Sequence, residues 1–259
     1  MSDRPKLSAL IIARDEAKNL PGCLATLGWV DEVVVVVDPA SRDETLAIAR
    51  RKADKVRVRP FDNFAAQRNA ALAMASGRWV FAIDADERAT PALAAEVRRV
   101  IAERGGLHVG YRLPIRSEIL GRRFGYSGTH DDRPLRLFRK GLGRWVGSVH
   151  ETVDLRGSAG ILGEPLRHRT IPNMKVFLRK LDYYTSLAAR ESLGRGEPVR
   201  QSDLILRPFW TFAKLYLGKQ GFRDGPEGFV FCAMSGVSVA VRHWKHRELV
   251  RADAQRRAA

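Results

Sequence analysis

Three short apolar runs without polar alternation mark the first third of the chain: Leu7–Ala13, Val33–Val37 and Trp79–Ile83. Runs of this kind are typical of parallel strands that are buried on both faces of a sheet. Helical patterns lie beside and between them, at Leu20–Leu27, Glu44–Ala53 and Phe64–Ala75. This alternation with short links predicts a doubly wound α/β sheet, whose ligands bind at the carboxyl ends of the strands.

The remainder divides into a sheet extension and a helical region. From Gly110 to about Gly163 the chain carries short strand-like pieces at Tyr111–Ile115 and Arg136–Phe138, which indicates a mixed-sheet extension around an acceptor site. Helical patterns return at Asn173–Gly194, Ser202–Gly218 and Pro226–Trp244. We therefore expect a catalytic domain over residues 1–170, with a donor-binding half (1–110) and an acceptor-side half (111–170), followed by a helical, basic region over residues 171–259.

Charge is uneven along the chain. Lys and Arg number 45 against 29 Asp and Glu, a net charge of +16, and almost all of the surplus lies after Gly110. Such a basic half could face nucleic acid, anionic lipid headgroups or a phosphorylated substrate, since each supplies dense negative charge. Charge alone does not choose among them.

Cysteine usage and hydropathy favour a cytoplasmic protein. Cys23 and Cys232 are far apart and each lies in an apolar stretch, which predicts buried free thiols in a reducing compartment. The first apolar run ends at Arg14-Asp15-Glu16, too soon for a signal peptide. The longest uncharged stretch, Phe229–Val241, is shorter than the roughly 18 to 20 residues that span a membrane. We expect no transmembrane segment.

The acids of Asp84-Ala85-Asp86-Glu87 follow the third apolar run directly. Two carboxylates one residue apart at a strand end can hold Mg²⁺ or Mn²⁺ and bridge it to a diphosphate, where the cation offsets charge on a leaving group. A solvated turn is the competing interpretation.

Polar residues also follow the other strands. The first strand ends in Ala13-Arg14-Asp15-Glu16 and the second in Asp38, so carboxylates there can accept hydrogen bonds from a base or ribose. Ser41 or Asp43 could equally cap the next helix. Gln67-Arg68-Asn69 interrupts an apolar helical pattern, for which a surface stripe is the default interpretation.

Six motifs occur in order: Leu10-Ile-Ile-Ala-Arg-Asp-Glu16, Trp29–Asp38 with Ser41-Arg-Asp-Glu-Thr45, Phe64-Ala-Ala-Gln-Arg-Asn69, Ile83-Asp-Ala-Asp-Glu87, Arg136-Leu-Phe-Arg-Lys140 and Val149-His-Glu151. With them the chain resembles the inverting family-2 glycosyltransferases, and within these the lipopolysaccharide core glucosyltransferase branch. The resemblance covers most of the chain and implies a GT-A fold that binds a nucleotide-sugar donor, for which we expect a UDP-linked sugar.

The resemblance also assigns residues. Glu16 and Asp38 would hold the nucleoside, Arg68 would meet the pyrophosphate or base, and Asp84 with Asp86 would engage ribose and a divalent cation. The donor-side set that we expect is Ala13, Arg14, Glu16, Asp38, Arg68, Asp84 and Ala85. For the metal we expect Asp86 and His150, with His168 as a further candidate; either histidine could instead be a hydrogen-bonded structural group.

Inverting transfer requires a general base that takes the proton of the acceptor hydroxyl. We expect Glu151 in this role, with Asp131 and Asp132 as rivals. Where the branch usually has glycine-rich and aromatic residues with Pro-Asp, this chain reads His130-Asp-Asp-Arg-Pro-Leu135, and acceptor specificity is open for that reason. By the resemblance, the acceptor is a lipid-linked or lipopolysaccharide-core glycan.

Two stretches of the helical region suit a membrane surface. Leu204–Leu217 combines aromatics, aliphatics and isolated cations in the manner of an interfacial helix, although a buried core helix fits equally. Phe229–Val241 is followed by the basic flank Arg242–Arg247, which includes Trp244. We expect a peripheral protein on the inner face of the cytoplasmic membrane.

Three other functions compete with glycosyl transfer. A nucleotidyltransferase that forms sugar nucleotides normally has a glycine-rich loop after the first strand, where this chain reads Arg14-Asp-Glu-Ala-Lys-Asn19. A nucleic-acid or polyanion-binding protein would explain the charge, but no recognised binding motif appears, so we expect no nucleic-acid partner. A non-catalytic scaffold is the third alternative, because fold does not fix function.

Overall fold

The computed structural model describes residues 6–102, 108–129, 133–147, 151–198 and 200–258. The chain forms two compact units. The first comprises Met1–Ile115 with Asp132–His168, and the second comprises Arg116–Asp131 with Arg169–Ala259. Each unit is described by itself below.

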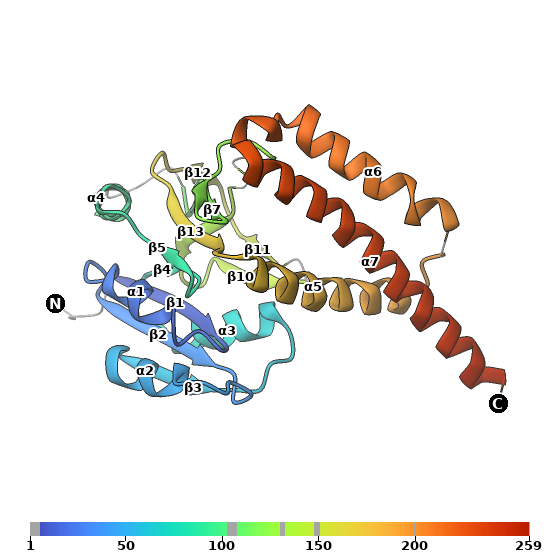
Figure 1. The fold of residues 1–259 in the computed structure, drawn as a ribbon. Coiled ribbons are helices and arrows are strands. Elements are labelled where there is room, and N and C mark those ends of the chain that lie inside the picture. Colours follow the sequence, from blue (N-terminus) through green and yellow to red (C-terminus); the bar gives the residue numbers. More distant parts are fainter. Residues whose placement is uncertain (1–5, 103–107, 130–132, 148–150, 199, 259) are drawn as a thin grey trace. The chain divides into compact units, whose positions relative to one another are not determined.

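A seven-stranded sheet forms the centre of the first unit (Figure 1). Its strands, in spatial order, are β12 (Ala159–Ile161), β6 (Gly110–Arg112), β9 (Leu135–Arg139), β4 (Trp79–Ala82), β1 (Leu7–Ala13), β2 (Glu32–Val37) and β3 (Lys55–Val58). The strands β3, β2, β1 and β4 run parallel, whereas β9 is antiparallel to both of its neighbours. The register pairs Leu10 with Val34 on one side and with Ala82 on the other.

Helices cover both faces of this sheet. The cores on the two faces show that α1 (Leu20–Ala25), α2 (Thr45–Lys52) and α4 (Pro91–Ala102) pack on one side. On the other side lie α3 (Phe64–Met74) and the hairpin of β10 (Gly143–Val146) and β11 (Thr152–Leu155). The doubly wound α/β sheet is therefore confirmed. Because every residue of β2 is buried, no polar alternation marks that strand.

A short pair of antiparallel strands also belongs to the first unit. The strand β5 (Glu87–Arg88) pairs antiparallel with the beginning of β13 (Leu166–Ile171), where His168 lies opposite Glu87. The expected strand Tyr111–Ile115 is divided between β6 and β7 (Ile115–Ile119), because Leu113 and Pro114 interrupt the pairing. The pairing of β13 with β5 places His168 beside the acidic segment that follows β4.

The second unit is mainly helical. It contains the hairpin of β7 and β8 (Arg122–Arg123), α5 (Met174–Gly194), the 3-10 turn η1 (Gln201–Leu204), α6 (Leu206–Ala213), the π-helical turn η2 (Lys214–Gly218), the 3-10 turn η3 (Gly221–Asp224) and α7 (Gly225–Ala258). Its core gathers Ile119, Phe124, Ile171 and Phe177, with Phe231 packed against them. The helix expected to end at Trp244 continues to Ala258.

Among the described residues, no helix combines the length and the hydropathy needed to cross a bilayer. Cys23 and Cys232 are both free and buried, as expected from their apolar surroundings.

Candidate functional site

Asp84 lies at the carboxyl edge of the sheet, two residues after β4, and binds two arginines. Its Oδ1 accepts from Nη2 of Arg68 at 2.7 Å, and its Oδ2 accepts from Nη2 of Arg136 at 2.9 Å. Arg68 comes from α3 and Arg136 from β9, so strands and helices far apart in sequence meet here. The surface stripe expected for Gln67-Arg68-Asn69 is wrong, because Gln67 and Arg68 are buried.

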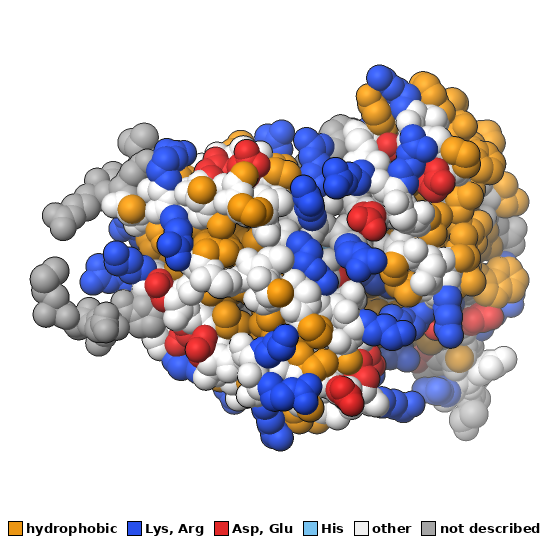
Figure 2. Space-filling view, turned by 60° about the vertical axis from the view of Figure 1, so that its left-hand side comes forward, with side chains coloured by type: hydrophobic (Ala, Val, Ile, Leu, Met, Phe, Trp, Pro, Cys, Tyr) orange, Lys and Arg blue, Asp and Glu red, His pale blue; other side chains and the backbone are white. Residues whose placement is uncertain are grey.

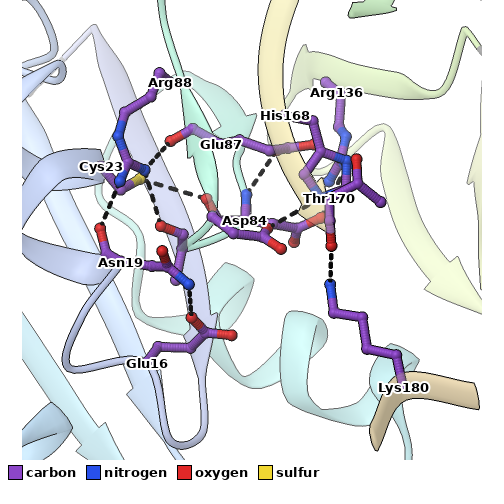
Figure 3. A network of polar contacts seen from close by, with 12 residues as sticks. Glu16, Asn19, Cys23, Asp84, Glu87, Arg88, Arg136, His168, Thr170 and Lys180 are labelled. Carbon is purple, nitrogen blue, oxygen red and sulfur yellow. Dashed lines mark hydrogen bonds and ion pairs between the residues drawn. The ribbon is translucent and has the colours of Figure 1, made fainter. Parts of the chain in front are cut away.

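Glu87 is the most deeply buried acid of this network. Its Oε1 accepts from Nη2 of Arg136 at 2.8 Å, and its Oε2 accepts from the backbone N–H of Asp84 at 2.7 Å. Figure 3 shows Asp84, Glu87 and Arg136 pointing toward one another. The solvated turn considered for this segment is therefore wrong for Glu87, which is fully buried.

Burial and charge act in opposite directions on these groups. Burial alone would raise the pKa of Asp84, but the charges of Arg136 and Arg68 hold that pKa well below its usual range. The pKa of Glu87 is raised, because burial and the neighbouring charge of Asp84 outweigh the effect of Arg136. Burial would lower the pKa of Arg136, yet Asp84 and Glu87 raise it. Arg68 and Arg136 therefore stay charged. Their pairing with carboxylates offsets the free-energy cost of burying a charge.

Arg68 also connects this network to Glu151. Its Nε donates to Oε1 of Glu151 at 3.0 Å while its Nη2 holds Asp84. Glu151 directly precedes β11, and the hairpin that carries it is tied to α3 through Asn69. The Asn69 side chain donates to the Trp145 carbonyl at 2.9 Å and accepts from the Trp145 N–H at 3.0 Å. Arg68 and Asn69 thus hold the hairpin, and Arg68 also makes the ion pair with Asp84, whereas the Gln67 side chain bonds to Arg59.

Asp86 lies next to His168, with Oδ1 3.2 Å from Nε2 of the imidazole. Burial would lower the pKa of His168, but the hydrogen bond and charge of Asp86, with Glu87 and Asp84, raise it. A carboxylate and an imidazole are two ligands that a divalent cation such as Mn²⁺ accepts. Within the described residues no group of three or more His, Cys, Asp or Glu side chains could hold a metal. Asp86 and His168 are therefore two possible ligands and not a complete metal site.

The ends of β1 and β2 meet at the same edge of the sheet. Asp38 is buried, and its backbone N–H donates to the Ala13 carbonyl at 3.1 Å. Its Oδ2 lies 3.3 Å from Nη1 of Arg14 and accepts no hydrogen bond from the described part of the chain. Such an acceptor has the capacity to bind an N–H of a ligand. Glu16 follows on the β1 side, where its N–H donates to Oγ1 of Thr45 at 2.8 Å.

Asp43 and Ser41 join the two loops that follow β1 and β2. Asp43 accepts from the backbone N–H of Thr45 and of Ala17, each at 3.0 Å. Ser41 Oγ accepts from the N–H of Asp15 at 3.3 Å, and Asp15 has a positive φ of 54°. These bonds hold the backbone of the segment that carries Arg14 and Glu16.

Most of the expected residues therefore lie in one unit and at one edge of the sheet. Ala85 is buried and its carbonyl accepts from Nη1 of Arg88 at 3.0 Å. Asp131, Asp132 and His150 lie outside the described residues. Sequence reasoning gave no role to Arg136 or Glu87. An arginine inside the apolar strand Leu135–Arg139 was the available signal, because a buried charge requires a partner.

These features define an α/β protein with a charged site at the carboxyl edge of a parallel sheet. Residues 8–148, more than half of the chain, match the model of glycosyl transferase family 2. The lipopolysaccharide core biosynthesis glycosyltransferase LpsC of Rhizobium meliloti (strain 1021) is 30% identical over 92% of this chain and 93% of its own length. An uncharacterized glycosyltransferase of Rickettsia felis is 25% identical over 94% of this chain and 90% of its own length.

Solved structures add a similarity at low identity. S. aureus TarS 1-349 aligns over 95% of this chain and 92% of its own, with 16% identity and a TM-score of 0.47. The sequence matches decide the assignment: the chain belongs to glycosyl transferase family 2. It is an enzyme, a glycosyltransferase with a GT-A type sheet and a long C-terminal helix.

Proposed function

We propose that the protein transfers a sugar from a nucleoside-diphosphate donor to a lipid-linked or lipopolysaccharide-core glycan, with inversion at C1 and with the assistance of a divalent cation. The observation that carries the proposal is the position of Arg68, which pairs at once with Asp84 after β4 and with Glu151 before β11. One side chain thereby joins the expected donor site to the expected base.

On the donor side, Asp38 and Glu16 bind the nucleoside in this proposal, with Arg14 beside them. The buried Oδ2 of Asp38 supports this, since it accepts no hydrogen bond within the described part of the chain and has the capacity to accept one from a base N–H. Asp84 binds ribose in the same scheme, and Arg68 meets the pyrophosphate. The backbone of Ala13 and of Ala85 completes the wall of the proposed donor site. We expect a UDP-linked donor.

The cation is proposed to bind at Asp86 and His168, with His150 as a further ligand candidate. There it would offset the negative charge that develops on the departing diphosphate. Arg68 and Arg136 supply fixed positive charge nearby, because their pairing with Asp84 keeps both guanidinium groups in place.

In the transfer step, the Glu151 carboxylate takes the proton of the acceptor hydroxyl. The hydroxyl oxygen forms its bond to C1 as the bond from C1 to the diphosphate breaks on the opposite face, which inverts the configuration. Arg68 holds Glu151 at 3.0 Å and so fixes its position for this proton transfer. Asp131 and Asp132 remain the rival bases.

The relative LpsC supports the proposed acceptor class, since its name places it in lipopolysaccharide core biosynthesis. A lipid-linked acceptor favours an enzyme that is cytoplasmic and peripheral on the inner face of the cytoplasmic membrane. The region from residue 171 onward is proposed to provide that membrane association, since it carries much of the positive charge.

Calorimetric titration with UDP, ADP and GDP, with and without Mn²⁺, tests the donor site. We expect one nucleotide to bind in a Mn²⁺-dependent manner, and Asp86→Ala to abolish that dependence. Asp154→Ala is the matched control, because Asp154 is an exposed acid on β11. Absence of binding by all three nucleotides would contradict the donor assignment, and strong polynucleotide binding in its place would favour the nucleic-acid alternative. Retained Mn²⁺-dependent binding in Asp86→Ala would remove the proposed cation site.

A further inference from the structure

The second unit exposes large apolar side chains on α6 and on the turns that flank it. No residue of α6 is buried. The exposed fractions are 74% for Ile205, 65% for Leu206, 72% for Phe209, 69% for Trp210 and 64% for Leu217. We call these five residues the α6 stripe. Most of them recur at helical spacing, so they gather on one side of the segment. The buried core helix considered for this segment is therefore wrong.

The other side of this segment packs on α7, which lies alongside α6 in Figure 1. The rings of Phe212 and Tyr216 stack with centroids 5.2 Å apart, and Phe229 of α7 meets both edge-on at 5.8 and 5.6 Å. The helices also cross closely, since a Cβ at Gly236 would lie 2.8 Å from the Pro208 carbonyl oxygen. The segment is thus held by one side, and the α6 stripe is left without a partner within the second unit.

Cations accompany the α6 stripe. From residue 204 to residue 222 the chain carries Arg207, Lys214 and Lys219 and no acidic residue. Arg207 pairs with Asp203 at 2.9 Å, and Lys214 is exposed. Figure 2 shows hydrophobic side chains gathered along one edge of the molecule, with Lys and Arg beside them. Aromatic and aliphatic groups flanked by cations match the boundary between the headgroups and acyl chains of an anionic bilayer.

The apolar part of α7 is less suited to this role. Phe231 and Met234 pack against the core of the second unit. In the basic flank that follows, Lys245 donates to Oδ1 of Asp182 on α5 at 2.7 Å. His246 is buried. Much of this stretch is therefore used for packing within the unit, whereas the α6 stripe is not.

We propose that the α6 stripe inserts into the headgroup boundary of an anionic lipid bilayer, with Lys214 at the headgroups. This inference rests on the proposed function, in which the acceptor is lipid-linked, and it names the surface by which the enzyme reaches that acceptor. The occupant is the bilayer itself, because positive charge beside an exposed apolar stripe complements anionic lipid and not a second copy of the same basic surface.

Co-sedimentation of the full chain with vesicles tests the proposal. We expect binding to vesicles of phosphatidylcholine with phosphatidylglycerol, and weaker binding to phosphatidylcholine alone. The double variant Phe209→Gln/Trp210→Gln removes the two aromatic groups, and we expect a loss on the order of 100-fold in the vesicle partition constant. Lys214→Gln should lose about fivefold on anionic vesicles. Ile161→Gln, a control on β12 of the first unit whose side chain is also largely exposed, should bind as the wild type does.

Full vesicle binding by the double variant would overturn the proposal. A wild-type dimer in sedimentation velocity that the double variant breaks would also overturn it, in favour of a second copy as the occupant. Nucleotide titration separates this inference from the proposed function. If the wild-type chain binds its nucleotide but no vesicle, only the lipid-binding role of the α6 stripe is refuted. If it binds vesicles through the α6 stripe but no nucleotide, the donor assignment is refuted.

Discussion

The two units depart from ordinary protein architecture in opposite ways. The first unit buries charge: Arg68 and Glu87 are buried beside Asp84, and the Arg136 side chain is only 12% exposed. The second unit exposes apolar surface, with Phe209 and Trp210 on α6. Buried ions cost free energy unless they are paired, and large exposed apolar groups are unusual in monomeric soluble proteins. The proposed donor site lies at the first departure, and the proposed lipid-binding surface lies at the second.

The largest effect that we expect in the first unit is on catalysis. Glu151→Gln keeps the shape of the side chain and removes its capacity to accept a proton. We expect kcat to fall by roughly 10² to 10⁴, the usual contribution of a general base, with nucleotide affinity nearly unchanged. Steady-state kinetics with the lipid-linked acceptor, together with nucleotide titration, would measure both. Asp154→Asn is the control, because Asp154 is an exposed acid on β11, the strand that Glu151 directly precedes. An unchanged kcat would transfer the role to Asp131 or Asp132.

Removing Arg136 tests whether the buried charges depend on one another. Arg136→Met leaves Asp84 with one arginine and leaves Oε1 of Glu87 without its ion-pair partner. Breaking a buried pair in this way costs about 3 to 5 kcal/mol of the free energy of unfolding. Urea denaturation would measure the loss. Arg144→Met, at an exposed pair with Asp154, should cost less than about 1 kcal/mol. Equal losses in the two variants would show that the network is not a buried unit.

The sequence predicted the parallel part of the fold well, for a physical reason. The strands β1, β2 and β4 are buried on both faces, so their apolar runs are unambiguous. The strand β3 was not expected, because its four residues Lys55–Val58 alternate charge and valine and lie partly exposed at the sheet edge. The division of the expected helix Ser202–Gly218 into η1, α6 and η2 was also missed, since its helical pattern gives no sign of where one type of helix gives way to another.

The site was predictable where a residue follows a strand in sequence and not where a distant partner decides its role. Asp38, Asp84 and Asp86 stand at strand ends and were expected. The contacts of Arg136 and Glu87 depend on the antiparallel pairing of β9 with β4, which local pattern does not determine. Their roles required the three-dimensional arrangement.

Acid sensitivity provides a smaller test in the first unit, away from the site. Glu32 is buried and accepts from Ser8 Oγ at 2.6 Å and the Ser76 N–H at 2.8 Å, with Lys55 Nζ at 2.7 Å. Burial alone would raise the pKa of Glu32, but these bonds lower it. A lowered pKa in the folded state gives stability above the unfolded-state pKa of about 4.3, and this stability is lost as the pH falls through the folded-state value.

Glu32→Gln should therefore destabilise the chain by roughly 2 kcal/mol at neutral pH, because it removes charge-assisted hydrogen bonds. The difference from the wild type should shrink as the pH falls below about 4. Urea denaturation at several pH values would measure it, with Glu44→Gln, an exposed acid, as the control. A difference that stays constant down to acidic pH would mean that the Glu32 charge contributes nothing.

The smallest effect is expected on the second unit, and it completes the contrast. Phe209→Gln replaces a large apolar side chain that is already exposed, so little apolar surface is returned to water on unfolding. We expect the free energy of unfolding to change by no more than about 0.5 kcal/mol, as for other surface substitutions. Phe177→Gln is the matched control, because Phe177 belongs to the buried core of the same unit and should cost several kcal/mol, about 3 or more. A large loss in Phe209→Gln, measured without lipid, would mean that Phe209 is covered by protein in solution, and α6 would then be an internal surface of an assembly.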